Sequence, residues 1–182
     1  MIVFECKSKK LVLETRSGDV NTAKEDLRKG IGKATAQCDQ LLNRFEDDGC
    51  LEFRSNGEEH RIDHDDVKMS FPVVVVGDQY DQIGMKLFDS AIDLPRTPLV
   101  VSVMDIDVIL KALDHPVKFI GYVSQRRNII TKELLFAQDE LDLLGLFLEK
   151  DGEFPELDDN QLLNLMDYSQ AVGTAIDYEY GP

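Results

Sequence analysis

Residues 2–11 read IVFECKSKKL, an apolar start to the chain that is interrupted by a carboxylate and an ammonium two residues apart. Side chains alternate between the two faces of a β-strand, so Val3, Glu5 and Lys7 share one face. The opposite face is apolar, and we expect it to lie in the core; it consists of Ile2, Phe4 and Cys6. The pair of Glu5 and Lys7 is therefore either an ordinary charged pair on an edge strand or part of an active site.

Further along the chain, strand patterns alternate with helix patterns. FPVVVV (71–76) and PLVVSV (98–103) are continuous apolar runs, which are typical of buried strands in parallel sheets. Helical spacing of apolar residues predicts helices over about 81–93 and 106–113, each after one of these strands. This order predicts an α/β sheet with helical crossovers.

A short strand, a long helix and a hairpin are predicted between the first strand and residue 71. The short strand covers 11–15. Apolar residues recur every three or four positions from Thr22 to Phe45, which predicts a long helix, although Gly30 and Gly32 weaken it. Asn56-Gly57 lies between two strand-like runs and predicts a hairpin.

The C-terminal third of the chain is predicted to be helical. The expected helices cover about 116–128, 138–149 and 159–173, and the tail AIDYEYGP is expected to carry no element. We therefore predict two parts: an α/β core over 1–114 and a helical extension over 115–182.

The charge is distributed unevenly along the chain. The whole chain contains 20 Lys and Arg against 35 Asp and Glu, a net charge of −15. Residues 1–44 contain nine basic and six acidic residues, a net charge of +3, so the remainder carries −18. Contacts with nucleic-acid phosphates need Lys and Arg, so the N-terminal region is the part of the chain suited to them.

Other features concern the cellular location. The longest apolar run is PVVVV (72–76), far shorter than the ~20 residues of a membrane span, and no signal-peptide pattern is present. Cys6, Cys38 and Cys50 form no C-x-x-C pair and predict neither a disulfide framework nor a zinc site. We predict a cytoplasmic protein without a membrane partner.

The E-C-K stretch on an apolar strand, followed by a helix with KGIGKATAQ (29–37), resembles the third motif of the restriction-endonuclease-like, or PD-(D/E)xK, nuclease superfamily. Three later stretches also resemble uncharacterised bacterial proteins with this core, so that the resemblance covers about residues 2–150: FPVVVVGDQYDQIG, PLVVSVMDID and QDELDLLGLFL. It implies a restriction-endonuclease-like mixed sheet flanked by helices.

The resemblance also implies roles for individual residues. Glu5 and the backbone carbonyl of Cys6 would hold Mg²⁺, and Lys7 would orient a water and stabilise negative charge at phosphorus. Gln37 would support the catalytic groups. Lys29 and Lys33, on the same helix, would contact the phosphates of DNA; the alternative is an ordinary solvated helix face.

The family also needs an upstream Asp as a second metal ligand, on the strand before E-x-K. Only Met1, Ile2, Val3 and Phe4 precede Glu5 here. We therefore expect a nuclease domain without its N-terminal part, and both an active metal-dependent endonuclease and an inactive fragment stay open. The alternative from another class is a non-enzymatic, acidic interaction or regulatory protein.

Overall fold

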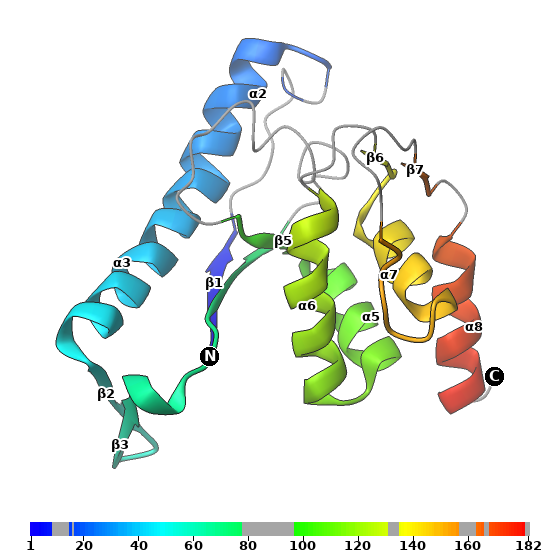
Figure 1. The fold of residues 1–182 in the computed structure, drawn as a ribbon. Helices are drawn as coiled ribbons and strands as arrows, with labels where there is room; N and C mark the ends of the chain where they lie inside the picture. The colour runs from blue at the N-terminus through cyan, green and yellow to red at the C-terminus, as the bar shows by residue number, and fades with distance from the viewer. Residues whose placement is uncertain are drawn as a thin grey trace.

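The structure is a computed structural model that describes residues 1–8, 15, 17–77, 97–130, 135–156, 163–165 and 168–180, the side chains of 177–180 excepted. Its described part has three layers (Figure 1). A long helical segment lies on one side of a small sheet, and the C-terminal helices lie on the other side. The mixed α/β class is confirmed. The strand predicted over 11–15, apart from Thr15, and the helix predicted over 81–93 lie outside the described residues.

The central sheet has three parallel strands in the order β1 (Ile2–Lys7), β4 (Phe71–Val76), β5 (Leu99–Ser102). Every residue of β4 is buried, as its run of valines predicted. In the register of the pairing, Glu5 lies beside Val74 and Lys7 beside Val76. The ladder continues past the strand ends, because the Gly77 N–H donates to the Lys7 carbonyl at 2.9 Å.

The long helix is continuous but changes its winding at the glycines. It consists of α2 (Val20–Leu27), a π-helical turn η1 (Arg28–Gly32) and α3 (Lys33–Asp48). Asp19 caps its start by accepting from the Thr22 N–H, and Gly49 ends it in the left-handed region at φ 69°. The predicted helix is confirmed, with the π-turn as an additional feature at the two glycines.

A hairpin follows α3 and projects away from the C-terminal helices (Figure 1). It pairs β2 (Cys50–Ser55) with β3 (Glu58–Asp63) around Asn56-Gly57, whose φ values are 51° and 85°. Positive φ at both central residues is the conformation that the Asn-Gly pair predicted. A 3₁₀ turn, η2 (His64–Asp66), leads back toward β4.

The remaining elements form the second helical layer. They are α5 (Val103–Leu113), α6 (Pro116–Ile130), β6 (Leu135–Phe136), α7 (Glu140–Glu149), β7 (Leu163–Asn164) and α8 (Ser169–Tyr180). A capping box between Ser102 and Asp105 starts α5 three residues before the predicted position.

The helix predicted over 159–173 is wrong in part, because only residues 169–173 are helical among its described residues, and the tail predicted without an element is wrong. The described residues hold the short strand β7 and then α8, which runs to Tyr180. Apolar spacing misled the prediction, because Leu163 and Leu165 fill a separate cluster around β6 and β7 rather than one face of a helix.

Two apolar cores form on the two faces of the central sheet. Val74, Val76 and Val100 face the long helix, and Val73, Val75, Leu99 and Val101 face the C-terminal helices. The second cluster draws residues from both sides of the boundary predicted at residue 114, which stays a prediction.

The expected burial of one face of β1 is wrong in part. Ile2 packs against the core, but Phe4 is 48% exposed and Cys6 is exposed. Within the sheet of the described residues β1 lies at an edge, and the described C-terminal helices pack over β4 and β5 rather than over the outer half of this face.

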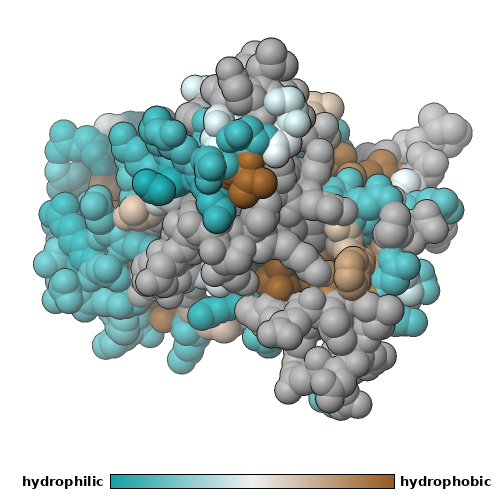
Figure 2. All heavy atoms as spheres, turned by 90° about the horizontal axis from the view of Figure 1, so that it is seen from above, coloured by the Kyte–Doolittle hydropathy of each residue, from teal (hydrophilic) through white to brown (hydrophobic). Residues whose placement is uncertain are grey.

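The surface that carries α2 and α3 is covered by hydrophilic side chains, as the view from above shows (Figure 2). Exposed ion pairs one helical turn apart contribute to it, for example Lys29 with Glu25 and Arg44 with Asp48. Among the helices of the described residues, none combines the length and the apolar character that a membrane span requires.

Candidate functional site

Three polar side chains meet where β1 ends against α3. The Lys7 Nζ lies 2.7 Å from the Glu5 Oε1 and 2.5 Å from the Gln37 Oε1. The side chains of Lys7 and Glu5 are 22% and 28% exposed, so both are partly shielded and still reach solvent. We call Glu5, Lys7 and Gln37 the polar cluster.

The sequence builds this cluster through two periodicities. Period two on β1 sends Val3, Glu5 and Lys7 to the face that α3 covers. On α3, Gln37 and Cys38 are neighbours, and the Cys38 Sγ lies 3.8 Å from the Val3 carbonyl. The helix α3 therefore packs against the first half of β1, and this packing places Gln37 beside the Lys7 ammonium at the end of the strand.

Burial and the nearby Glu5 carboxylate raise the pKa of the Cys38 thiol to about 11, from an ordinary value of 9.0. Both causes oppose the thiolate. Cys38 therefore stays a neutral thiol at physiological pH and packs as an apolar side chain, since its side chain is buried.

We expect alkylation to separate the cysteines on the two sides of β1. Iodoacetamide at pH 8 should modify exposed Cys6 rapidly and leave Cys38 unmodified until urea unfolds the chain, as peptide mass spectrometry would report. Equal rates for Cys6 and Cys38 in the folded protein would show that α3 does not cover β1.

The same pKa has a consequence for stability. Between pH 9 and pH 11 the unfolded chain loses the Cys38 proton and the folded chain keeps it, so stability should fall as pH rises through this window. The denaturant midpoint should decrease more between pH 8 and pH 10.5 for the wild type than for Cys38→Ala. An equal decrease in both proteins would contradict the assignment.

The two lysines predicted to contact phosphate lie outside the polar cluster. Lys29 pairs with Glu25 at 2.5 Å on the exposed face of the helix, and it lowers the pKa of that carboxyl. Lys33 is exposed in the first turn of α3, one turn before Gln37. The structure therefore brings Glu5, Lys7 and Gln37 together, with Lys33 as a neighbour on the helix.

The cluster offers a limited set of metal ligands. Glu5 supplies a hard carboxylate oxygen. The Met1 and Lys7 carbonyls accept hydrogen bonds from the N–H groups of Phe71 and Gly77. Successive carbonyls of a strand point to opposite sides, so the Cys6 carbonyl points toward the outer edge of β1. Within the described ranges, no three His, Cys, Asp or Glu side chains lie close enough to hold a metal together. A cation here would need water and substrate oxygens as well, which is usual for Mg²⁺.

One polar network was not anticipated from the sequence. The neighbouring residues Arg126 and Arg127 lie in different environments. Arg127 is exposed in the last turn of α6, whereas Arg126 is buried and forms two hydrogen bonds to Glu140, at 2.5 and 2.7 Å. Tyr122, one turn earlier on α6, donates to the same carboxylate at 2.5 Å.

Comparison with known protein families, with curated proteins and with solved structures found no match to this chain. The functional interpretation therefore depends on the geometry of the polar cluster and on the chemistry of its side chains.

Proposed function

We propose that the chain carries the catalytic face of a metal-dependent nuclease of the PD-(D/E)xK kind, acting on DNA phosphodiesters. The observation that carries the proposal is the contact of Lys7 with both Glu5 and Gln37. One carboxylate from the same strand and one amide from a helix, 30 positions from Lys7, converge on the Lys7 ammonium. A solvated surface pair between Glu5 and Lys7 needs no third partner from another element.

The chemistry of the cluster suits phosphoryl transfer. The Lys7 ammonium can hold a non-bridging phosphate oxygen and stabilise the negative charge that develops there. Gln37 fixes the position of the ammonium, and Glu5 offers a carboxylate to a hard cation. Mg²⁺, when bound beside the phosphate, would supply Lewis-acid stabilisation of the same charge.

The position of the cluster agrees with this proposal. Lys7 and Gly77 lie at the carboxyl ends of adjacent parallel strands, where α/β proteins commonly bind ligands. Lys33 stands one helical turn from Gln37 and is exposed, so it is suited to a second phosphate contact.

The test is cleavage of plasmid DNA in the presence of Mg²⁺. We expect Glu5→Gln and Lys7→Met each to lower the cleavage rate by about 100-fold or more, the range for losing one charge-stabilising group. Gln37→Ala, which removes a positioning group, should lower it by about 10-fold to 100-fold. Thermal unfolding of each variant shows whether the fold is retained.

A matched control is the exposed ion pair of Lys111 with Asp107 on α5, at 2.6 Å. Lys111→Met removes the same kind of charge as Lys7→Met and should leave cleavage unchanged. Cleavage that survives Glu5→Gln and Lys7→Met would come from a contaminant and would reject the proposal.

The second candidate is a non-enzymatic interaction protein with a basic partner. The observation in its favour is the net charge of −15. It predicts no cleavage, no effect of Mg²⁺ on thermal stability, and binding to a basic partner that weakens as salt is raised.

A further inference from the structure

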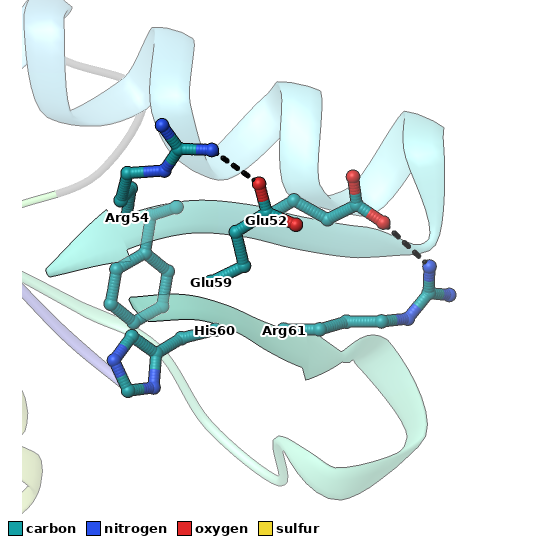
Figure 3. Close-up of a pocket in the computed structure, with 6 residues that line it drawn as sticks. Glu52, Arg54, Glu59, His60 and Arg61 are labelled. Atoms are coloured by element: carbon teal, nitrogen blue, oxygen red, sulfur yellow. Dashed lines mark hydrogen bonds and ion pairs between the residues drawn. The ribbon is translucent and has the colours of Figure 1, made fainter. Parts of the chain in front are cut away.

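The β2–β3 hairpin presents strand edges that could accept a partner. It is a two-stranded sheet, and no third strand of the described residues pairs with either edge. Six of its residues line an open pocket of about 430 Å³, and Figure 3 shows how they lie: Glu52, Phe53, Arg54, Glu59, His60 and Arg61. An isolated two-stranded hairpin is only marginally stable, so a partner strand would stabilise it.

The side chains of the hairpin alternate in charge across its two strands. Arg54 pairs with Glu59 at 2.5 Å, and Arg61 pairs with Glu52 at 2.9 Å, as the dashed lines in Figure 3 mark. Phe53 and His60 are the cross-strand pair between them in the register, so they stack on the opposite face of the hairpin, with ring centroids 5.2 Å apart. Phe53 is nevertheless 43% exposed, so an apolar ring remains open to solvent at the middle of β2.

The outer edge of β2 is complementary to itself. In an antiparallel pairing of two copies with the twofold axis at Phe53, Glu52 of each copy lies opposite Arg54 of the other. Each row of charges then reads Arg61, Glu52, Arg54, Glu59 across four strands and alternates in sign throughout. The two Phe53 rings meet on the axis.

The backbone hydrogen bonds agree with this register. Ser55 and Glu58 flank the two-residue turn and form a hydrogen-bonded pair, and such pairs alternate with non-bonded pairs along the ladder. The backbone groups of Glu52 and Arg54 therefore point away from β3. These are the two residues that would pair across the axis.

We propose that β2 docks against β2 of a second copy of this chain, giving a four-stranded antiparallel sheet across a twofold axis. The other edge is less suited to self-pairing. β3 carries Glu58, Glu59 and Asp63 against one arginine, and Arg61 already holds Asp63 at 2.7 Å and Glu52. β2 carries one acid and one base, and an apolar ring lies at its centre.

The decisive test is charge complementation, measured by sedimentation equilibrium at moderate salt so that the net charge is screened. Glu52→Arg alone places arginines opposite arginines across the axis, and Arg54→Glu alone places glutamates opposite glutamates. Each should weaken self-association by about tenfold or more. In an equimolar mixture of the two variants, positions 52 and 54 are both basic in Glu52→Arg and both acidic in Arg54→Glu. Every pair across the axis then joins opposite charges, and the mixture should associate at least as tightly as the wild type.

Lys111→Glu is the matched control, since it reverses a charge in an exposed pair on α5. It should associate like the wild type. A wild type that stays monomeric at high concentration would overturn the proposal. It would also be overturned if association were restored by mixing Glu59→Arg with Arg61→Glu, on β3, and not by mixing the two β2 variants. The outcome is independent of the polar cluster, which lies toward the other end of α3.

Discussion

Glu140→Ala is expected to lower the free energy of unfolding by about 3–5 kcal/mol, the range for removing one partner of a buried ion pair. The side chains of Arg126 and Glu140 are 3% and 4% exposed, so the variant leaves a guanidinium buried without its carboxylate. The hydroxyl of Tyr122, a fully buried residue, loses its carboxylate acceptor at the same time and keeps only the main-chain carbonyl of residue 140, at 3.5 Å. Urea denaturation at pH 7 measures the change.

Two controls make this prediction specific. Arg127→Ala removes the exposed neighbouring charge and should change stability by less than about 0.5 kcal/mol. A triple variant with Tyr122→Phe, Arg126→Met and Glu140→Leu replaces the network by apolar groups and should recover most of the loss. A loss below about 1 kcal/mol for Glu140→Ala would mean that water reaches the pair.

Gly145→Ala is expected to displace α8 from α7. A Cβ at residue 145 would lie 1.9 Å from the Tyr168 carbonyl oxygen and 2.4 Å from its carbonyl carbon. The obstacle is backbone, which cannot rotate away, so the chain entering α8 must shift. We expect a loss of about 1–3 kcal/mol or more and earlier proteolysis within α8.

Gly121→Ala on α6 is the opposite case and serves as the control. Nothing lies within 4 Å of a Cβ added there. Alanine should therefore stabilise α6 by up to about 1 kcal/mol through helix propensity alone. Thermal melts of the two variants should move in opposite directions. A Gly145→Ala protein that melts like the wild type would show that the two helices do not approach so closely.

The local elements were predictable where one short-range rule decides them. The valines of β4, the Asn56-Gly57 turn and the long helix all follow from patterns within a few residues. The π-turn did not follow, because Gly30 and Gly32 weaken a helix without specifying how it rewinds. Leu163 and Leu165 were misassigned because their cluster forms through pairing with β6, which apolar spacing does not reveal.

The polar cluster was predictable only where a short-range rule applies. Period two places Glu5 and Lys7 on one face of a strand, and the contact of Gln37 with Lys7 depends on α3 packing on that face. The resemblance of the helix to a known nuclease element indicated a role for Gln37 from the sequence alone. The nuclease activity itself remains a proposal.

The buried network was not predictable from sequence. Arg126 and Glu140 lie 14 residues apart on different helices, and neither residue type is normally buried. Next to Arg127, the sequence presents Arg126 as half of an exposed basic pair. Only the packing of α6 against α7 distinguishes the two arginines.

The parallel pairing of β1 with β4 has a consequence for folding. Ser55 meets Glu58 across a two-residue turn, whereas Ile2 must find Phe71 across the whole helix and hairpin. Local contacts form in microseconds, but distant ones must first close a long loop, so the first strand should join last. Among the described strands it also pairs with β4 alone, so it should detach early in native-state hydrogen exchange. Every such opening separates Lys7 from Gln37, so the lifetime of the polar cluster is set by the local unfolding of a single strand.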